Sequence, residues 1–483
     1  MTLDLSTVIK AYDVRGLVPE QIDEGVVRAL GAAFAEVVVV PEAAGGPARA
    51  VVGHDMRPSS PALSAAFADG LASRGVDVEV IGLCSTDGLY YASGARGVPG
   101  AMFTASHNPA EYNGIKLCRA GARPVGQDTG LVAVRERAQT WLDAGAVPAG
   151  EGRRGTVGES DLLRDYAAHL RSLVDLSGAR PLRVVVDAGN GMAGHTVPAV
   201  LGDAAGLPAL PLDVTALYFE LDGTFPNHEA NPLDPANLVD LQAAVPRAGA
   251  DLGLAFDGDA DRCFVVDEKG EPVSPSAVTA LVARREIAKE LAAGREPVII
   301  HNLITSLAVP EIVTEDGGRP VRTRVGHSFI KQRMADEDAV FGGEHSAHYY
   351  FRDFWSADTG MLAAMHVLAA LAESDRPLSE LAAEYERYTA SGEINSRVAD
   401  ASAVTESVVA TISAEEEAAG RPVEIDRLDG VTVTGSDEPG GRWWFNLRAS
   451  NTEPLLRLNA EGADPAAMER IRDRVLALIG AAA

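Results

Sequence analysis

The sequence predicts an α/β protein with a repeated strand–helix unit, followed by a C-terminal domain of α+β type. Three observations support this prediction. Short β-branched runs recur along the first two thirds of the chain, and each ends in a polar or glycine-rich turn. Alanine-rich stretches with helical character lie between these runs. The last hundred residues instead contain segments in which apolar and polar residues alternate, as in an antiparallel sheet.

The β-branched runs are the clearest elements. Continuous apolar strands of this kind are buried on both faces, as in parallel sheets covered by helices. Three of the strands begin near residues 51, 184 and 298, and this recurrence predicts a repeated α/β unit. The runs lie at 48–55, 183–191, 252–259 and 297–302, and the helical stretches include 61–75 and 281–294. Functional loops are expected at the carboxyl ends of the strands.

The length of 483 residues exceeds what one compact core supports, so several domains are expected. Turn-rich stretches at 143–159, 267–276 and 373–379 are candidate linkers. The stretch after 373–379 is expected to be helical and acidic to about residue 418, and alternating segments follow it. The predicted domains are 1–150, 151–269, 270–373 and 374–483.

Composition excludes several classes of protein. Apolar residues make up 46% and charged residues 23%, which is ordinary for a globular chain. The formal net charge of -27 disfavours binding to nucleic acid and to anionic membranes. Sugar phosphates would also be repelled, so a site for them requires a local cluster of Arg, Lys and metal. Three scattered cysteines, the absence of a leader pattern and the absence of a membrane-length apolar run predict a cytoplasmic protein with reduced thiols.

The first chemical motif is MFTASHNPAEYNGIK at 102–116. A strand ending at Phe103 would deliver Ser106 into a tight loop, because Pro109 biases the preceding residue away from helix. Such a loop can present the Ser106 hydroxyl as a nucleophile, with His107 and Lys116 near enough to assist. A serine in a turn is more often structural, so this motif alone is weak evidence.

The second motif is AFDGDADRCF at 255–264. Asp257, Asp259 and Asp261 alternate, so an extended loop turns three carboxylates toward one point. Uncompensated like charges repel, and a hard cation such as Mg²⁺ is the natural compensation. A calcium loop of the EF-hand type is the competing reading, but the glycine position and the strand context disfavour it. Arg262 can pair with a carboxylate or meet a transferring phosphoryl group.

The third and fourth motifs are VFGGEHSAHYYF at 340–351 and LRASNTEPLLRL at 447–458. A carboxylate and a hydroxyl two residues apart, as in the third, can bond neighbouring sugar hydroxyls, although such residues also satisfy buried backbone groups. The guanidinium, hydroxyl and amide donors of the fourth fit a phosphate dianion, with a surface turn as the alternative. The candidate residues are Glu344, Ser346 and His348 in the third motif, and Arg448, Ser450, Asn451, Thr452 and Arg457 in the fourth.

Together the four motifs resemble those of the α-D-phosphohexomutase superfamily, specifically its bacterial phosphomannomutase/phosphoglucomutase group. TASHNP resembles the phosphoserine loop, DGDADR the metal loop, GEHSAH the sugar-binding loop and RASNTEP the phosphate-binding loop. They occur in the family's order, and the resemblance spans essentially the whole chain. It implies three similar mixed-sheet α/β domains plus a C-terminal α+β domain around a central cleft. Ala347 stands where many relatives carry glycine.

The resemblance also implies an activity and a set of roles. Hexose 1-phosphate and hexose 6-phosphate would be interconverted, with mannose or glucose as the sugar, through phospho-Ser106 and a hexose 1,6-bisphosphate that also serves as activator. Ser106, Asp257, Asp259 and Asp261 would hold Mg²⁺. Lys116 or His327 would serve as general acid or base, and Arg15 and Arg262 would stabilise charge.

Three other functions are open at this point. Phosphoglucosamine mutase is a rival within the class, disfavoured by Thr104 and His345. A metal-dependent phosphohydrolase with a serine nucleophile would not need a second phosphate clamp. A sugar-phosphate binding protein would need neither Ser106 nor the aspartates. The expected partners are small hexose phosphates, with no nucleic acid and no membrane, and the expected oligomeric state is monomer or dimer.

Overall fold

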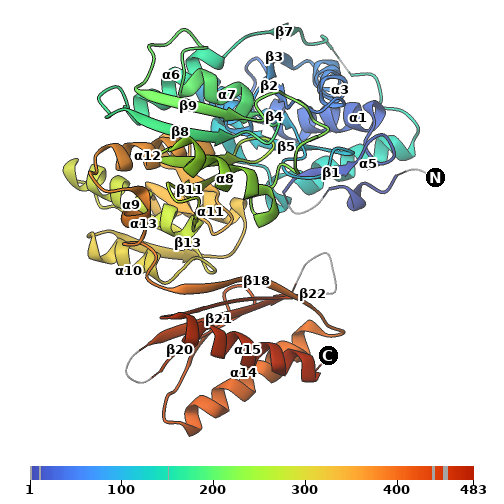
Figure 1. Ribbon diagram of the computed structural model, residues 1–483. Coiled ribbons are helices and arrows are strands. Elements are labelled where there is room, and N and C mark those ends of the chain that lie inside the picture. The colour runs from blue at the N-terminus through green and yellow to red at the C-terminus, as the bar shows by residue number, and fades with distance from the viewer. Residues whose placement is uncertain (1–2, 10–11, 151, 438–440, 450–454, 483) are drawn as a thin grey trace.

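The computed structural model describes residues 3–9, 12–150, 152–437, 441–449 and 455–482. Within them the chain forms four sheets, one after another along the sequence (Figure 1). Three are mixed sheets flanked by helices, and the last is antiparallel. The predicted fold class, three similar α/β domains plus a C-terminal α+β domain, is therefore confirmed.

The first sheet has the order β1-β5-β4-β2-β3-β7, with β6 beside β5. Its central strand β2 runs parallel to β3 and β4, whereas β5 is antiparallel to both β4 and β1. The strands are β1 Val14–Leu17, β2 Arg49–His54, β3 Asp77–Leu83, β4 Gly100–Phe103, β5 Tyr112–Arg119, β6 Arg123–Pro124 and β7 Val157–Glu159. Its helices include α1 Glu24–Phe34, α3 Ser60–Ser73, α4 Thr86–Arg96 and α5 Leu131–Asp143.

The second and third sheets repeat this arrangement, with the orders β12-β11-β10-β8-β9 and β14-β13-β15-β16-β17. In each, the central strand lies between two parallel neighbours, and two antiparallel strands complete one side. The central strands β2, β8 and β13 are the three runs whose recurrence predicted a repeat. The strands are β8 Leu182–Asp187, β9 Leu212–Leu217, β10 Leu252–Phe256, β11 Cys263–Asp267, β12 Pro272–Val273, β13 Val298–Asn302, β14 Arg319–Thr323, β15 Phe341–Gly343, β16 Tyr349–Phe351 and β17 Ala357–Asp358.

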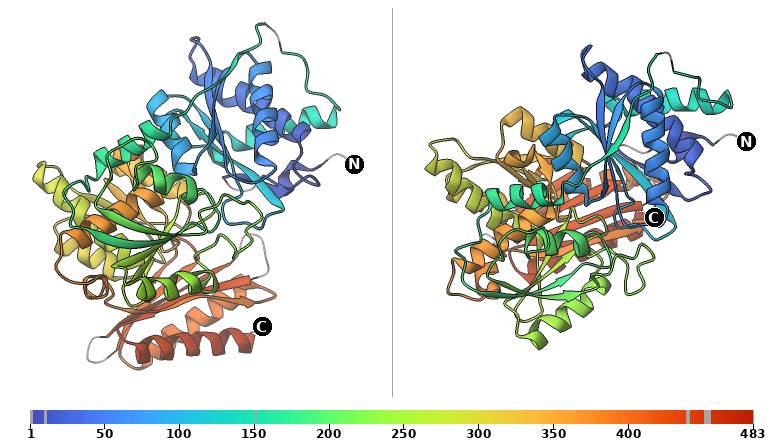
Figure 2. Two further views of the ribbon diagram at one scale, coloured as in Figure 1. Left: turned by 45° about the horizontal axis from the view of Figure 1, so that its top comes forward. Right: turned by 90° about the horizontal axis from the view of Figure 1, so that it is seen from above.

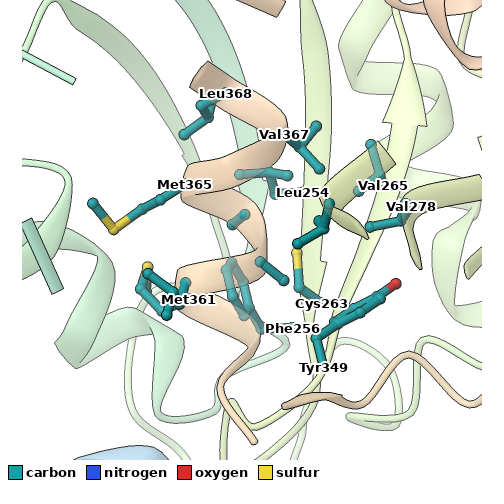
Figure 3. Packing of buried hydrophobic residues seen from close by; sticks show 14 of the residues in the cluster. Leu254, Phe256, Cys263, Val265, Val278, Tyr349, Met361, Met365, Val367 and Leu368 are labelled. Carbon is teal, nitrogen blue, oxygen red and sulfur yellow. The ribbon is translucent and has the colours of Figure 1, made fainter. Parts of the chain in front are cut away.

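Helices cover these two sheets and join them. They include α6 Leu163–Leu173, α7 Ala193–Val200, α8 Val239–Ala248, α9 Pro275–Ala292, α10 Ala308–Glu315, α11 His327–Glu337, α12 Gly360–Ala372 and α13 Leu378–Ala382. Figure 3 shows α12, which carries Met361 and Met365, beside the strands of the second sheet that carry Phe256 and Cys263. These side chains belong to one buried apolar cluster that continues through the second and third domains and into the first. Burying one such side chain contributes about 1.5–3 kcal/mol, so this shared core binds the repeats firmly together.

The C-terminal domain has a core of its own. Its antiparallel sheet, ordered β18-β22-β21-β20-β19, packs two helices on the face turned away from the other domains (Figures 1 and 2). Its attachment to the third domain includes polar contacts, such as Arg442 with Glu311 and Arg387 with Glu315. The elements are β18 Thr389–Arg397, α14 Ala401–Ala418, β19 Glu424–Asp426, β20 Val431–Ser436, β21 Arg442–Ala449, β22 Leu455–Gly462 and α15 Pro465–Ala482.

One expectation within this domain was wrong. The stretch from 379 to about 418 was expected to be helical, but β18 occupies Thr389–Arg397 and only the part from Ala401 is the long helix α14. β18 is an edge strand whose side chains are at most half-buried, so its sequence lacks the apolar alternation that marks a strand.

The domain boundaries stay predictions. Two short strands, β7 and β12, extend the first and second sheets beyond residues 150 and 269.

Cys84, Cys118 and Cys263 are buried free thiols. Among the described residues, no helix combines the length and the apolar character needed to cross a bilayer.

Candidate active site

Three of the four predicted motifs occupy the same position in the three repeated sheets. Each lies where the chain leaves the outer parallel strand and returns as its antiparallel partner: β4 to β5, β10 to β11, and β15 to β16. Each of these loops contains one residue with a left-handed backbone, at Ser106 (φ 50°), Ala260 (φ 60°) and Ala347 (φ 65°). A left-handed non-glycine residue is strained and marks a tightly constrained turn. A glycine at 347 would adopt this conformation without that strain.

Ser106 lies at the contact between the first two domains and is 4% exposed. Its Oγ donates a hydrogen bond to Asp257 Oδ2 at 2.8 Å and lies 3.2 Å from His107 Nδ1. The metal loop approaches so closely that a Cβ on Gly258 would lie 2.4 Å from the Ser106 carbonyl oxygen. Glycine at 258 is therefore required to bring the serine and the carboxylates together.

Arg57, which was not predicted from the sequence, supports the backbone of the serine loop. Its side chain is fully buried and donates to the carbonyl oxygens of Ser106 and Asn108 at 3.0 and 2.7 Å. It also donates to those of Pro109 and Tyr112 at 2.8 and 2.9 Å. Asp55 Oδ2, 3.3 Å from Arg57 Nε, balances its charge. Because Asp55 and Arg57 directly follow β2, the rule that functional loops lie at carboxyl ends of strands could have indicated them.

The three aspartates of the metal loop are almost fully buried and bring their carboxylate oxygens within 4.8 Å of one another. Asp259 Oδ1 and Asp261 Oδ1 have no hydrogen-bond partner among the described residues. Burial and the charge of Asp259 raise the pKa of Asp261, the usual result of crowding carboxylates without full compensation. Unpartnered buried oxygens in this number fit a hard divalent cation. Glu268, the acid that a calcium loop could recruit, instead accepts hydrogen bonds from Ser379.

Two further contacts fix Asp259. Lys116 Nζ lies 2.7 Å from Asp259 Oδ2 and 2.5 Å from Asp261 Oδ2. Burial alone would lower the pKa of Lys116, but these two carboxylates raise it well above its ordinary value. Thr86, at the start of α4, donates its hydroxyl to Asp259 Oδ2 at 2.5 Å. Lys116 was predicted from the sequence, whereas Thr86 was not, because its partner is 173 residues away along the chain.

Two arginines flank the serine. Arg262 Nε is 2.8 Å from Asp257 Oδ2, and its side chain is 3% exposed. Arg15 pairs with Asp13 at 2.8 Å and donates to Asn108 Oδ1 at 2.5 Å. Burial and these two guanidinium groups lower the pKa of His107 to about 2. His107 is therefore neutral at physiological pH.

These residues line one cavity of about 1040 Å³. It brings together six of the predicted residues that lie outside the metal set, along with Asp261 and Ser106. They are Arg15, His107, Lys116, Arg262, His327 and His348, with Tyr12, Tyr90 and Asp358 as unpredicted neighbours. Burial lowers the pKa of His327 to about 3, so this imidazole is also neutral. Lys331 supports the far wall, because its Nζ lies 2.6 Å from Asp358 Oδ1 and 4.0 Å from the Tyr90 ring centroid.

The sugar loop is ordered by its own hydrogen bonds. Glu344 is 3% exposed and accepts from Tyr350 Oη at 2.7 Å and from Asn302 Nδ2 at 3.1 Å. Ser346 Oγ lies 3.0 Å from His348 Nδ1. His348 in turn lies 3.7 Å from Asp261, so the loop touches the metal loop through its histidine.

The predicted phosphate clamp lies at a second cavity of about 660 Å³. Arg448 on β21 and Arg457 on β22 are direct cross-strand neighbours and both line it. Arg448 lies 3.8 Å from Glu393 and 3.6 Å from Asp429, and Arg457 lies 3.5 Å from Glu393. The other three predicted members, Ser450, Asn451 and Thr452, lie outside the described residues.

The arrangement thus has two functional ends. One holds a buried hydroxyl beside crowded carboxylates, two arginines and neutral histidines, which suits phosphoryl transfer. The other offers arginines around an open cavity, which suits binding of a phosphate that does not react.

Family models match each of the four domains in order. The descriptions are phosphoglucomutase/phosphomannomutase, alpha/beta/alpha domain I at residues 6–141, domain II at 164–270 and domain III at 274–388. The C-terminal domain of the same family matches residues 393–478.

Individual proteins give the same result. A phosphomannomutase of Salmonella typhimurium is 40% identical over 473 residues, which cover 97% of this chain and 98% of that protein. A protein of Xanthomonas campestris described as phosphohexose mutases is 40% identical over 465 residues, 96% of each chain. Among solved structures, a phosphoglucomutase/phosphomannomutase family protein of Burkholderia thailandensis superposes with a TM-score of 0.81 at 30% identity, covering 99% of this chain and 97% of that one.

Proposed function

This chain belongs to the phosphoglucomutase/phosphomannomutase family, and from that premise we propose that it interconverts hexose 1-phosphate and hexose 6-phosphate through phospho-Ser106. The observation that carries the proposal is the placement of Ser106 Oγ, 2.8 Å from a carboxylate of the metal loop, in a cleft that has a separate arginine clamp. A hydrolase would need only the first of these two features.

The aspartates and Ser106 would hold Mg²⁺, which when bound supplies neutralisation of charge on the transferring phosphoryl group. Asp257, Asp259 and Asp261 offer the oxygen ligands, and their unpartnered atoms support this assignment. Arg262 and Arg15 add positive charge near the serine.

In the first half-reaction, phospho-Ser106 gives its phosphoryl group to the free hydroxyl of the sugar phosphate. The bond from phosphorus to Ser106 Oγ breaks, and a bond to the sugar oxygen forms. The hydroxyl proton goes to a base of the cavity; His327 is suited to accept it because its imidazole is neutral. Lys116, whose pKa is raised, stays protonated and is the proposed donor of the proton that the departing Ser106 Oγ takes up.

In the second half-reaction, the hexose 1,6-bisphosphate turns over in the cleft and returns its other phosphoryl group to Ser106. The bond from phosphorus to that sugar oxygen breaks, a bond to Ser106 Oγ forms, and the sugar oxygen takes up the proton held by His327. The serine must then lose its hydroxyl proton. His107 Nδ1, 3.2 Å from Oγ and neutral, is placed to accept it. Added bisphosphate would act as activator by phosphorylating any chain that has lost its phosphoryl group.

The distal arginines hold whichever phosphate is not reacting, and Glu344 and Ser346 would contact sugar hydroxyls that occupy equivalent positions in both orientations. The names of the relatives favour mannose or glucose over glucosamine as the sugar.

A coupled assay with mannose 1-phosphate, glucose 1-phosphate and glucosamine 1-phosphate, with catalytic hexose bisphosphate and Mg²⁺, tests the proposal. Ser106→Ala is expected to lower kcat by at least about 10⁴-fold, because it removes the group that carries the phosphoryl. Ser172→Ala, which changes a serine on the outer surface of α6, serves as the matched control. Full mutase activity in Ser106→Ala, or an intact mass that never gains a phosphoryl group, would refute the mechanism.

A further inference from the structure

The cavity beside the distal arginines has walls from three domains. The first domain contributes residues 124 and 126–129, the third contributes residues between 324 and 332, and the C-terminal domain contributes Asp429, Arg448, Ala449 and Arg457. A phosphate bound there would therefore meet the third domain as well as the C-terminal clamp.

The two clamp arginines do not carry free charge. Glu393 lies within 3.8 Å of both guanidinium groups, and Asp429 lies 3.6 Å from Arg448. Within the described part of the clamp, two arginines with two acids leave no local excess of positive charge. A protein with a formal charge of -27 needs such an excess to hold a phosphate dianion.

Arg324 supplies a guanidinium without an acid. It is exposed, it lines the cavity, and it forms no ion pair with any other residue that the structure describes. Its guanidinium instead lies 4.8 Å from the ring centroid of Phe329, a side chain that is itself 45% exposed. Arg319 and Arg333, exposed arginines of the same domain, both pair with Glu337. A stacked arginine keeps its donors available while its side chain is held in place.

The backbone around Arg324 is anchored so that its position is defined. Two residues earlier, Arg322 pairs with Asp426 of the C-terminal domain, and one residue later the Val325 amide donates to Asp429 at 3.2 Å. Helix α11 begins at His327, and Gly326 and Ser328 beside its N-terminus line the same cavity. A helix N-terminus favours an anion. The acid on the facing wall, Asp128, is exposed to solvent, which screens its charge.

We infer that Arg324 is a third guanidinium for the non-reacting phosphate and that it provides the uncompensated positive charge of that site. The inference rests on the proposed mutase function, because only a substrate that carries a phosphate distant from the reacting hydroxyl requires this site. Since either end of the sugar can be the distal one, Arg324 serves the 1-phosphate and the 6-phosphate alike.

Binding of glucose 6-phosphate and glucose 1-phosphate, measured by calorimetry in a Ser106→Ala background that prevents turnover, tests this directly. Arg324→Gln is expected to raise Kd about tenfold for both sugar phosphates, the effect of one charge-assisted contact. Arg324→Lys keeps the charge but loses the planar stack, so its Kd should lie between that of the parent and that of Arg324→Gln. Arg333→Gln, which also removes one arginine from the third domain, is the matched control and should bind as the parent does.

In otherwise wild-type enzyme, Arg324→Gln should raise KM about tenfold while kcat changes less than about twofold, because binding lost equally in ground and transition states leaves kcat unchanged. An unchanged Kd and KM in Arg324→Gln would overturn the inference, as would equal losses in Arg333→Gln. Sugar phosphate that binds to the wild-type chain without being isomerised would refute the proposed function instead, and the Kd comparison would still decide the role of Arg324.

Discussion

The reaction end and the clamp end of the cleft use the same kinds of charged residue for different tasks. At the reaction end, the charged contacts are short and buried: Lys116 lies 2.5 and 2.7 Å from its aspartates, and Arg262 lies 2.8 Å from Asp257 with 3% of its side chain exposed. At the clamp end, the guanidinium–carboxylate distances are 3.5–3.8 Å, and Arg457 is 32% exposed.

This difference in contact distance and burial indicates that the charged groups at the reaction end are preorganised, whereas those at the clamp end are available to bind phosphate. Charges fixed in a buried site stabilise a transition state without reorganising, which suits the end where phosphorus changes partners. The clamp must bind a phosphate, release it and bind the other one, so loose and solvated pairs suit it better. The packing agrees, since the C-terminal domain has its own core. One apolar cluster instead runs through the second and third domains and into the first, which also has a cluster of its own. Substitutions at the reaction end should therefore act on kcat, and those at the clamp on KM.

Asp259→Asn should give the largest effect. It removes a ligand charge and weakens the contacts with Lys116 and Thr86, so the apparent affinity for Mg²⁺ should fall by at least about 100-fold, with a matching fall in kcat at low metal. Titration of activity with Mg²⁺ measures both. Asp213→Asn, an exposed position on β9 of the same domain, is the control. Unchanged dependence on Mg²⁺ in Asp259→Asn would remove this residue from the ligand set.

Arg57→Lys should come next. A lysine cannot reach four carbonyl oxygens at once, so the serine loop should shift and kcat should fall by about 100-fold, with little change in KM. Steady-state kinetics and the phosphorylated fraction by mass spectrometry test this. Arg74→Lys is the control, because Arg74 is a second largely buried arginine of the first domain that pairs with Glu36 and stacks on Trp141. If both variants lose stability equally and neither loses kcat, Arg57 only supports folding.

Arg448→Gln should affect the other kinetic parameter. Loss of one charge-assisted contact to phosphate is expected to raise KM by about tenfold or more while kcat stays within about threefold. Arg442→Gln, on the same strand but paired with Glu311 at the seam with the third domain, should leave KM unchanged. A fall in kcat with unchanged KM would contradict the division of labour between the two ends.

Ala347→Gly, in the sugar loop, should change stability and activity least among these variants. The left-handed backbone at Ala347 costs about 1 kcal/mol, and glycine removes this strain at some cost in chain entropy. The variant should be as stable as the parent or more stable by up to about 1 kcal/mol, as measured by chemical denaturation, with kcat retained. Clear destabilisation would show that the Ala347 methyl group, which is fully buried, matters more for packing than the strain does.

Much of the fold could be predicted because its signals are local. The runs that became β2, β8 and β13 are buried on both faces, so each reads as a continuous apolar segment. The edge strand β18 has no such signal, and it was not predicted.

The site residues that could be predicted also have local signals. Ser106, the aspartates and the sugar loop sit within compact motifs, whereas Thr86, Arg57, Lys331 and Arg324 stand alone among ordinary residues.

The sequence by itself determined the four motifs, and their resemblance to those of the phosphohexomutases predicted the reaction class, because the nucleophile and the metal-loop carboxylates fall within two short segments. Only the tertiary structure decided how these segments cooperate. It placed Ser106 2.8 Å from Asp257, a residue 151 positions away, and put Arg57 behind the serine loop. It also showed that the clamp arginines are neutralised while Arg324 has no acid among the described residues. The physical reason is that charge balance and hydrogen bonding are set by neighbours in space, which the chain brings together only after folding.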